Sequence, residues 1–355
     1  MTIRYAIPLA LLLIAGCDTM SPGDERVIGG VDLDVLFAPA TPAEIAEAEA
    51  TWAARDVAAA GLAILRQDTI QITPGAQSVL YVISHVLDGT HYAAVAVPVG
   101  ATDPLPVFMY AHAGDEGVSI DETIPLLSLG VNQLIDQFIF VVPSFRGEPL
   151  IYDGVALTST GAPSPLDRDV DDALALLDAL PAVTPVADTS RIGLLGFSRG
   201  AGVAMLMGAR RPGIDAISAF FGPTDFFGPY VQDIFSDALR GTPRDLPGFD
   251  HLNATYIQPL KAGQLTIADV RPELVRRSPV LFAGKMPALQ IQHGTADQTV
   301  DVSQAQAMID AMTALGRTSP DFEYFLYPGA GHNPIEMIGS FDRVVAFFGE
   351  WFGDE

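Results

Sequence analysis

Eight short apolar runs, each bounded by glycine, proline or polar residues, constrain the fold of this chain more than any other feature of its sequence. The first two flank the turn Leu87-Asp88-Gly89-Thr90 and predict a β-hairpin. The eight runs are residues 78–86, 91–98, 105–111, 138–143, 191–196, 216–222, 288–292 and 322–327. Helical patterns lie between several of them, at residues 169–180, 200–209, 302–315 and 341–352. This alternation predicts an α/β fold with a mostly parallel eight-stranded sheet and helices on both faces.

Residues 225–279 depart from this alternation, since they are aromatic and acidic at first and then rich in proline and glycine. They separate the sixth and seventh predicted strands, so we interpret them as an insertion over one edge of the sheet. Two interpretations remain open at this point. The insertion is either a lid over a functional site or the ordinary helices of a long crossover.

The pentapeptide Gly196-Phe197-Ser198-Arg199-Gly200 has the pattern G-x-S-x-G between a predicted strand and a small, apolar helix start. A serine at such an elbow is held in strained backbone geometry, and the flanking glycines remove Cβ atoms that would clash. The helix N-terminus offers free N–H groups to a developing negative oxygen. We therefore predict Ser198 as a nucleophile and the Arg199 N–H as an oxyanion donor, against the alternative of a structural tight turn.

A serine hydroxyl needs a general base, and the base needs an acid that orients it. In this architecture the chain order is nucleophile, acid, base. Asp297 follows the seventh predicted strand, and His332 follows the last strand within a glycine-rich segment. We predict these two residues as the acid and the base. His293 competes as the base, but its position four residues before Asp297 favours a role in bracing the loop.

The second oxyanion donor is expected in the loop after the strand at residues 105–111. That loop is rich in small residues, which let the backbone approach a substrate oxygen. We predict the N–H of Ala113 as the donor, with Gly114 as the alternative, and expect His112 to position the loop.

These motifs together resemble the α/β-hydrolase superfamily, and more narrowly the catalytic domain of the prolyl oligopeptidase family and its esterase relatives. The resemblance rests on the pentapeptide and on residues 142–147, 188–193, 278–279, 283–289, 293–300 and 327–332. It implies the same triad of Ser198, Asp297 and His332. Oligopeptidases of this family carry an N-terminal β-propeller that gates the site, and the residues before Ser78 are too few to form one. The usual basis for selecting peptides by size is therefore not expected here.

The N-terminal residues resemble a bacterial lipoprotein signal. An apolar run of residues 6–16 is shorter than the ~20 residues that a membrane-spanning helix needs, and Cys17 follows it. We predict a signal peptide at residues 1–16, lipidation of Cys17, and a tether at residues 17–40. This would place the protein in the bacterial cell envelope, anchored to a membrane and facing the periplasm or the exterior.

Residues 41–77 are predicted as an N-terminal helical segment, followed by a catalytic domain at residues 78–355. Thr41 as N-cap, Pro42 at the first helical position and Glu44 three residues after the cap indicate a helix start. The alanine-rich stretch that follows extends the predicted helix to about Arg66.

Composition narrows the function further. The 355 residues carry a formal net charge of −24, which disfavours binding to nucleic acid and to anionic membrane surfaces. The single cysteine excludes an intramolecular disulfide and a thiolate metal cluster. We expect a serine hydrolase without metal or organic cofactor that acts on small esters, amides or short peptides. The alternatives are a serine peptidase of the prolyl oligopeptidase type and a non-catalytic binding module on the same fold.

Overall fold

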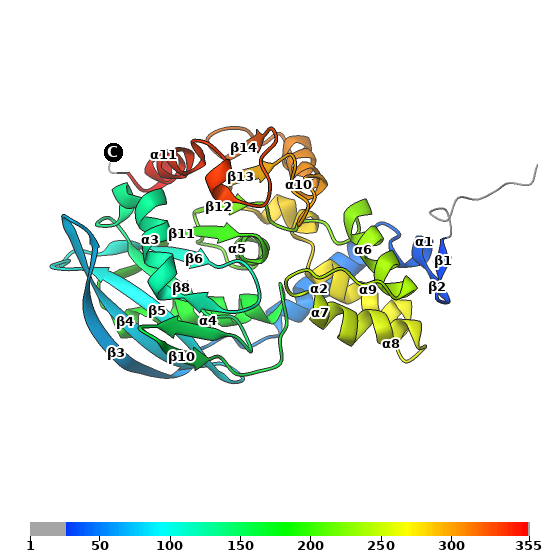
Figure 1. The fold of residues 1–355 in the computed structure, drawn as a ribbon, viewed down its shortest axis with the longest axis horizontal. Coiled ribbons are helices and arrows are strands. Elements are labelled where there is room, and N and C mark those ends of the chain that lie inside the picture. Colours follow the sequence, from blue (N-terminus) through cyan, green and yellow to red (C-terminus); the bar gives the residue numbers. More distant parts are fainter. Residues whose placement is uncertain (1–25, 354–355) are drawn as a thin grey trace, which may run out of the picture.

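The computed structural model describes residues 26–353, and its centre is a nine-stranded sheet (Figure 1). The strand order is β14-β13-β12-β11-β6-β8-β5-β4-β3. The strands are β3 (Ala60–Thr73), β4 (Ala76–Val86), β5 (Thr90–Pro98), β6 (Leu105–Ala111), β8 (Ile139–Pro143), β11 (Ala187–Phe197), β12 (Ala216–Phe220), β13 (Ala288–Gly294) and β14 (Phe322–Tyr327). Strands β14 to β8 run parallel, and β5, β4 and β3 continue the sheet antiparallel.

Helices cover both faces of this sheet, as predicted. Alternate residues of β6 show the two layers, because Val107 and Met109 pack into one apolar cluster and Phe108 and Tyr110 into the other. The first cluster includes side chains of α4 (Arg168–Val183), α5 (Arg199–Arg210) and α10 (Ser303–Ala314). The second includes α3 (Ile120–Gly130) and α11 (Ser340–Phe352). A sheet buried on both faces explains why its central strands read as continuous apolar runs.

The predictions of an eight-stranded sheet and of a helix as far as Arg66 are wrong. Helix α2 (Pro42–Ala53) begins with the predicted capping box at Thr41 and Glu44, but it ends at Ala53. Residues 60–73 form the edge strand β3, which pairs antiparallel with β4. The segment at residues 41–77 is therefore not a separate helical unit, because its second half belongs to the catalytic sheet.

The predicted tether at residues 17–40 is also wrong over its described part. Strands β1 (Val27–Ile28) and β2 (Val31–Asp32) and helix α1 (Leu33–Leu36) are folded there. Leu33, Leu36 and Phe37 are buried, and the Phe37 ring packs edge-on against Phe235 with a centroid separation of 5.3 Å. Apolar burial of this kind attaches the segment to the body of the protein.

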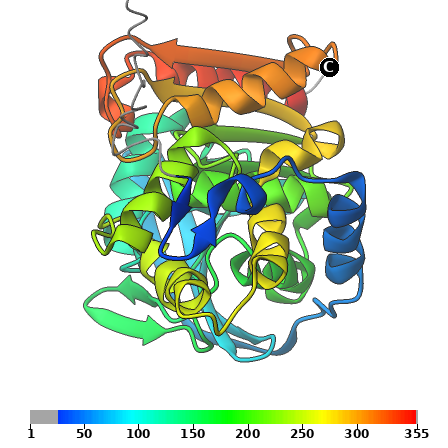
Figure 2. The ribbon, with the colours of Figure 1, turned by 90° about the vertical axis from the view of Figure 1, so that its right-hand side faces the viewer.

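The predicted insertion forms a helical cap at one end of the molecule, beside β1, β2 and α1 (Figures 1 and 2). It contains α6 (Pro229–Arg240), α7 (Phe249–Leu252), the π-helical turn η2 (Asn253–Ile257), α8 (Gln258–Lys261) and α9 (Ile267–Arg276). Arg271 of α9 joins the cap to the N-terminal segment, donating to the Leu36 carbonyl at 2.8 Å and to Glu44 at 2.7 Å.

Smaller elements complete the described chain. A second sheet has the order β10-β9-β7, formed by β7 (Val118–Ser119), β9 (Pro149–Tyr152) and β10 (Val155–Thr158). The 3₁₀ turns are η1 (Asn132–Leu134), η3 (Pro279–Lys285) and η4 (Pro334–Glu336). No helix within residues 26–353 has the length and apolar character needed to cross a membrane. The predicted signal peptide and the lipidation at Cys17 lie outside the described residues and stay predictions.

Candidate active site

Ser198 occupies a strained elbow between β11 and α5. Its φ angle is +52°, which is unusual for a residue with a side chain, and its N–H donates to the Phe220 carbonyl at 2.9 Å. The flanking glycines are required by close backbone contacts. A Cβ on Gly196 would lie 2.4 Å from the Gly200 carbonyl oxygen, and a Cβ on Gly200 would lie 2.1 Å from the Ala111 carbonyl oxygen. The elbow predicted from the pentapeptide is therefore present.

The structure brings Ser198, Asp297 and His332 together beyond the carboxyl ends of the parallel strands β11, β13 and β14. His332 Nε2 lies 2.9 Å from Ser198 Oγ, and His332 Nδ1 lies 2.7 Å from Asp297 Oδ2. Because a carboxylate only accepts, Nδ1–H donates to it and Nε2 is left free to accept the serine proton. This is the arrangement by which an acid orients a base against a nucleophile.

Backbone contacts join the loop after β13, which carries Asp297 and is called the acid loop, to the loop after β14, which carries His332. A Cβ on Gly294, at the end of β13, would lie 2.2 Å from the Ala330 carbonyl oxygen. The Ala296 N–H donates to that same carbonyl at 2.9 Å, and the Thr295 N–H donates to the Tyr327 carbonyl at 2.9 Å. The separation between Asp297 and His332 is thus set by backbone hydrogen bonds.

The carboxylate of Asp297 is held in its ionised form. Burial would raise the pKa of Asp297, but hydrogen bonds from His293, His332 and the Val300 N–H hold that pKa well below its ordinary value. The N–H groups of Thr299 and Val300 donate to Asp297 Oδ1 at 2.9 and 3.0 Å, which leaves Oδ2 directed to the histidines. An ionised acid is what stabilises an imidazolium during proton transfer.

His293 braces the acid loop, as its spacing from Asp297 indicated. The residue is fully buried, and its Nε2 lies 2.9 Å from the Val300 carbonyl oxygen and 3.4 Å from Asp297 Oδ2. Since the Nε2–H faces these two acceptors, this nitrogen is not free to take a proton from Ser198.

The loop after β6 packs against the elbow through both His112 and Arg199. His112 Nδ1 donates to the Ala113 carbonyl at 2.9 Å, and its ring stacks on Phe145 with centroids 4.2 Å apart. Burial lowers the pKa of His112 to about 3, so the ring is neutral at ordinary pH. Arg199 Nη1 donates to the Gly114 carbonyl at 3.2 Å. These contacts place the backbone around Ala113 beside the first turn of α5.

Solved structures with the same architecture include esterases and peptidases. The acetyl xylan esterase 1 of Thermoanaerobacterium sp. JW/SL YS485 is 16% identical with a TM-score of 0.57, and the match covers 94% of this chain and 99% of that one. A puromycin-hydrolyzing peptidase of Mycobacterium tuberculosis is 19% identical with a TM-score of 0.52, covering 82% of this chain and 40% of that one. An acylaminoacyl peptidase of Pyrococcus horikoshii is 14% identical with a TM-score of 0.52, covering 85% and 51%.

The chain has the α/β-hydrolase fold. Residues 266–355 also match the prolyl oligopeptidase family, so the resemblance read from the motifs is confirmed over the segment that holds Asp297 and His332. A comparison with curated proteins gave no match.

Among residues 26–353, no group of three or more His, Cys, Asp or Glu side chains is arranged to hold a metal ion.

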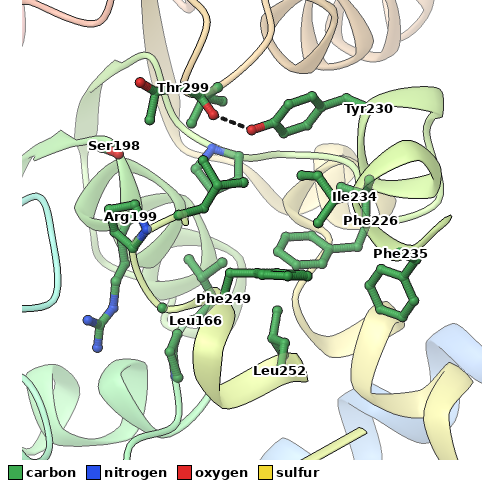
Figure 3. Close-up of a pocket in the computed structure, with 17 residues that line it drawn as sticks. Leu166, Ser198, Arg199, Phe226, Tyr230, Ile234, Phe235, Phe249, Leu252 and Thr299 are labelled. Carbon is green, nitrogen blue, oxygen red and sulfur yellow. Dashed lines mark hydrogen bonds between the residues drawn. The ribbon is translucent and has the colours of Figure 1, made fainter. Parts of the chain in front are cut away.

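An apolar pocket opens beside Ser198 in this hydrolase fold (Figure 3). Its cavity volume is about 90 Å³. Ser198, Arg199, Thr299 and Val300 line the end near the elbow, and the cap supplies most of the remaining wall. The apolar side chains of that wall include Phe226, Ile234, Phe235, Phe249 and Leu252. The insertion between β12 and β13 therefore forms part of the candidate site.

Hydrogen bonds join the cap to both sides of the site. The Tyr230 hydroxyl of α6 donates to the Thr299 carbonyl in the acid loop (Figure 3), and burial raises the pKa of Tyr230 to about 12. On the other side, the Gly248 N–H donates to Asp115 Oδ2 at 2.8 Å. The neutral phenol and the Asp115 carboxylate thus hold the cap over the pocket in this structure.

Several side chains that support these groups were not predicted from the sequence. The ring of Phe221 packs on the imidazole of His332 with centroids 4.3 Å apart, and Phe221 itself has a φ of +40°. Its position directly after β12, at the same sheet edge as Ser198, was a signal in the sequence. The partners of the Arg199 side chain, Asp169 and Glu148, were not predicted either, since Asp169 lies in the first turn of α4 and Glu148 lies after β8 in a segment with no catalytic motif of its own.

Proposed function

We propose that this protein is a serine hydrolase that cleaves carboxylic esters or small amides through an acyl-enzyme. The observation that carries the proposal is His332 placed between Ser198 Oγ and Asp297, at 2.9 and 2.7 Å. In the first step Ser198 Oγ attacks the carbonyl carbon while His332 Nε2 takes the hydroxyl proton. The N–H groups of Arg199 and Ala113 stabilise the oxyanion, as expected for helix-terminal and loop donors.

The imidazole of His332 transfers protons in both half-reactions, acylation and deacylation. The His332 imidazolium gives its proton to the leaving alcohol or amine, which departs as the carbonyl reforms and leaves the acyl group on Ser198. A water molecule then loses its proton to His332 and attacks the acyl-enzyme. Collapse of that second intermediate releases the carboxylic acid and returns the proton to Ser198 Oγ.

The apolar pocket supports assignment of the acyl side of the substrate. His332 must face the leaving group in order to protonate it, and His332 does not line the pocket. Because Ser198 and Arg199 line the pocket and His332 does not, we assign the pocket to the acyl group. Pockets for drug-sized molecules are on the order of 300–1,000 Å³, and this cavity is about 90 Å³. We therefore expect a small, uncharged, apolar acyl group.

A serine peptidase is the second candidate, favoured by the match of residues 266–355 to the prolyl oligopeptidase family. The same acyl-enzyme chemistry would cleave a peptide bond if the pocket accepted an apolar amino-acid side chain. Substrates for both candidates are small molecules or short peptides, consistent with the apolar and restricted pocket.

A substrate panel tests the proposal and separates the two candidates. Purified residues 26–355 are assayed with p-nitrophenyl acetate, butyrate and octanoate and with apolar amino-acyl p-nitroanilides, with Ser198→Ala as the control. We expect turnover of the short esters by the wild type and a loss of ~10⁴–10⁶ in kcat for the variant. Faster cleavage of the anilides would favour the peptidase. If neither class is turned over, or the variant matches the wild type, the enzymatic proposal is wrong and a binding module remains.

A further inference from the structure

The side chain of Arg199 is buried within the protein although it follows the nucleophile directly. Only 4% of the residue is exposed, and the guanidinium points away from the apolar pocket (Figure 3). Its Nε and Nη2 donate to Asp169 Oδ2 at 3.0 and 2.7 Å, and its Nη1 donates to Glu148 Oε1. A buried cation is costly unless it is paired, and here two carboxylates pair with it. The guanidinium therefore has a fixed position.

Aromatic packing fixes the guanidinium further. It lies over the Phe145 ring at 4.6 Å from the centroid, and the other ring stacked on Phe145 is His112. A planar guanidinium suits such a stack and a forked set of acceptors in a way that a lysine ammonium does not. Arg199, Phe145 and His112 thus connect α5 to the loop after β6.

Arg199 reaches this loop at the residue after the proposed oxyanion donor. Its Nη1 donates to the Gly114 carbonyl at 3.2 Å. At the start of the loop, the carbonyls of Ala111 and His112 lie in close contact with Gly200. A Cβ on Gly200 would lie 2.1 and 2.5 Å from their oxygens. The Ala113 peptide therefore lies between two points at which the loop contacts α5.

We infer that the Arg199 side chain is a positioning residue for the oxyanion site. It holds the Gly114 carbonyl, and with it the Ala113 N–H, at the place where a tetrahedral intermediate needs a donor. This inference rests on the proposed serine hydrolase function. Arg199 then stabilises the tetrahedral intermediate in two ways. Its backbone N–H donates to the oxyanion directly, and its side chain positions the loop that carries the Ala113 N–H.

Arg210 supplies a matched control on the same helix. Its side chain is 4% exposed against 3% for Arg199, and it also pairs with an α4 aspartate, Asp171. It also lies over an aromatic ring, that of Trp52, at 5.2 Å. Arg210→Met therefore removes a comparable buried ion pair without touching the oxyanion loop. A purely structural role predicts similar consequences for Arg199→Met and Arg210→Met.

The test compares wild type, Arg199→Met, Arg199→Lys and Arg210→Met in kcat, KM, Tm and the inhibition constant of a trifluoromethyl ketone. That inhibitor forms a tetrahedral adduct with an oxyanion on an active serine. For Arg199→Met we expect kcat on p-nitrophenyl acetate to fall roughly 10- to 100-fold with little change in KM. The inhibition constant should rise by a similar factor. Arg210→Met should lower Tm without either effect.

If Arg199→Met fails to fold, Arg199→Lys tests the positioning role instead. Lysine keeps the positive charge between the carboxylates but cannot donate to Asp169, Glu148 and the Gly114 carbonyl at the same time as the planar guanidinium does. We expect it to lose kcat and ketone affinity together. Wild-type kcat and affinity in Arg199→Lys, or equal losses in the Arg199→Met and Arg210→Met variants, would overturn the inference and leave the proposed function standing. An inactive wild type in which Ser198 is also unlabelled by a fluorophosphonate would overturn both.

Discussion

His293 Nε2 and His332 Nδ1 both lie near the same oxygen, Asp297 Oδ2, at 3.4 and 2.7 Å. The two histidines differ in what their Nε2 atoms face. That of His332 faces Ser198 Oγ at 2.9 Å, whereas that of His293 faces the Val300 carbonyl at 2.9 Å. One carboxylate thus contacts both the partly exposed His332, the proposed base, and the buried His293.

This difference predicts losses of kcat of very different size for the two histidine variants. His332→Ala removes the only one of these two groups that contacts the nucleophile, so kcat should fall by ~10⁴ or more. His293→Gln should lower Tm and reduce kcat by about 10-fold at most, because His293 contacts the acid loop and does not contact Ser198. Steady-state kinetics and thermal denaturation check both. Comparable losses of kcat in the two variants would contradict the assignment of His332 as the base.

Acyl-chain preference is expected to follow the end wall of the pocket. Phe249→Leu enlarges the cavity and should raise the ratio of kcat/KM for p-nitrophenyl octanoate over acetate. Leu252→Phe fills it and should lower that ratio. A shift of roughly 10-fold is typical of a methylene-sized change in an apolar pocket. The two variants serve as controls for each other, and a ratio unmoved by either would place the acyl group elsewhere.

Gly200 and Gly349 provide a matched test of the elbow packing, because both are glycines within helices. A Cβ on Gly200 would lie 2.1 Å from a backbone oxygen, whereas nothing lies within 4 Å of a Cβ on Gly349. Gly200→Ala should destabilise the protein by about 3 kcal/mol or more, or prevent folding. Gly349→Ala should be neutral or stabilising by up to ~1 kcal/mol. Urea denaturation measures both, and an equally stable Gly200→Ala would contradict the observed contact.

Buried histidine makes stability depend on pH below neutrality. Burial lowers the pKa of His85 to about 4, assisted by the nearby His91 and opposed by the backbone of Asp172. The unfolded chain binds a proton at about pH 6.5, so the folded state binds fewer protons between pH 6.5 and 4. Stability contributed by the neutral ring is therefore lost as pH falls through that window.

His85→Phe should remove the contribution of His85 to this dependence. The free energy of unfolding of the wild type should decline relative to the variant by about 2 kcal/mol between pH 7.5 and pH 5. The comparison at pH 7.5, where His85 is neutral in both states, corrects for the change in packing. Parallel pH profiles for the two proteins would show that His85 is not the responsible group.

The sequence allowed prediction of the central strands and the three separated residues for specific physical reasons. Strands buried on both faces read as unbroken apolar runs, and the elbow requires Gly196 and Gly200 where backbones nearly touch. The edge strand β3 has no such signature, because one side of it is unpaired and its residues are largely exposed or half-buried. Its alanines favour a helix locally, and pairing with β4 overrides that preference.

The surroundings of the triad were harder to foresee. The contact of Arg199 with Asp169 links residues 30 positions apart through the packing of α4 against α5, which no local pattern encodes. The folding of residues 27–37 against the cap likewise depends on Arg271, more than 230 positions away. Long-range polar partners of this kind become visible only once the helices are placed in space.

Mass-spectrometric mapping of a fluorophosphonate adduct reports whether Ser198 is an activated nucleophile, because the probe phosphonylates only a serine whose hydroxyl is activated by a base. We expect a single adduct on the peptide containing Ser198, which is lost in Ser198→Ala and forms much more slowly in His332→Ala. An intact wild-type protein with no adduct on Ser198, or labelling that persists unchanged in both variants, would contradict it.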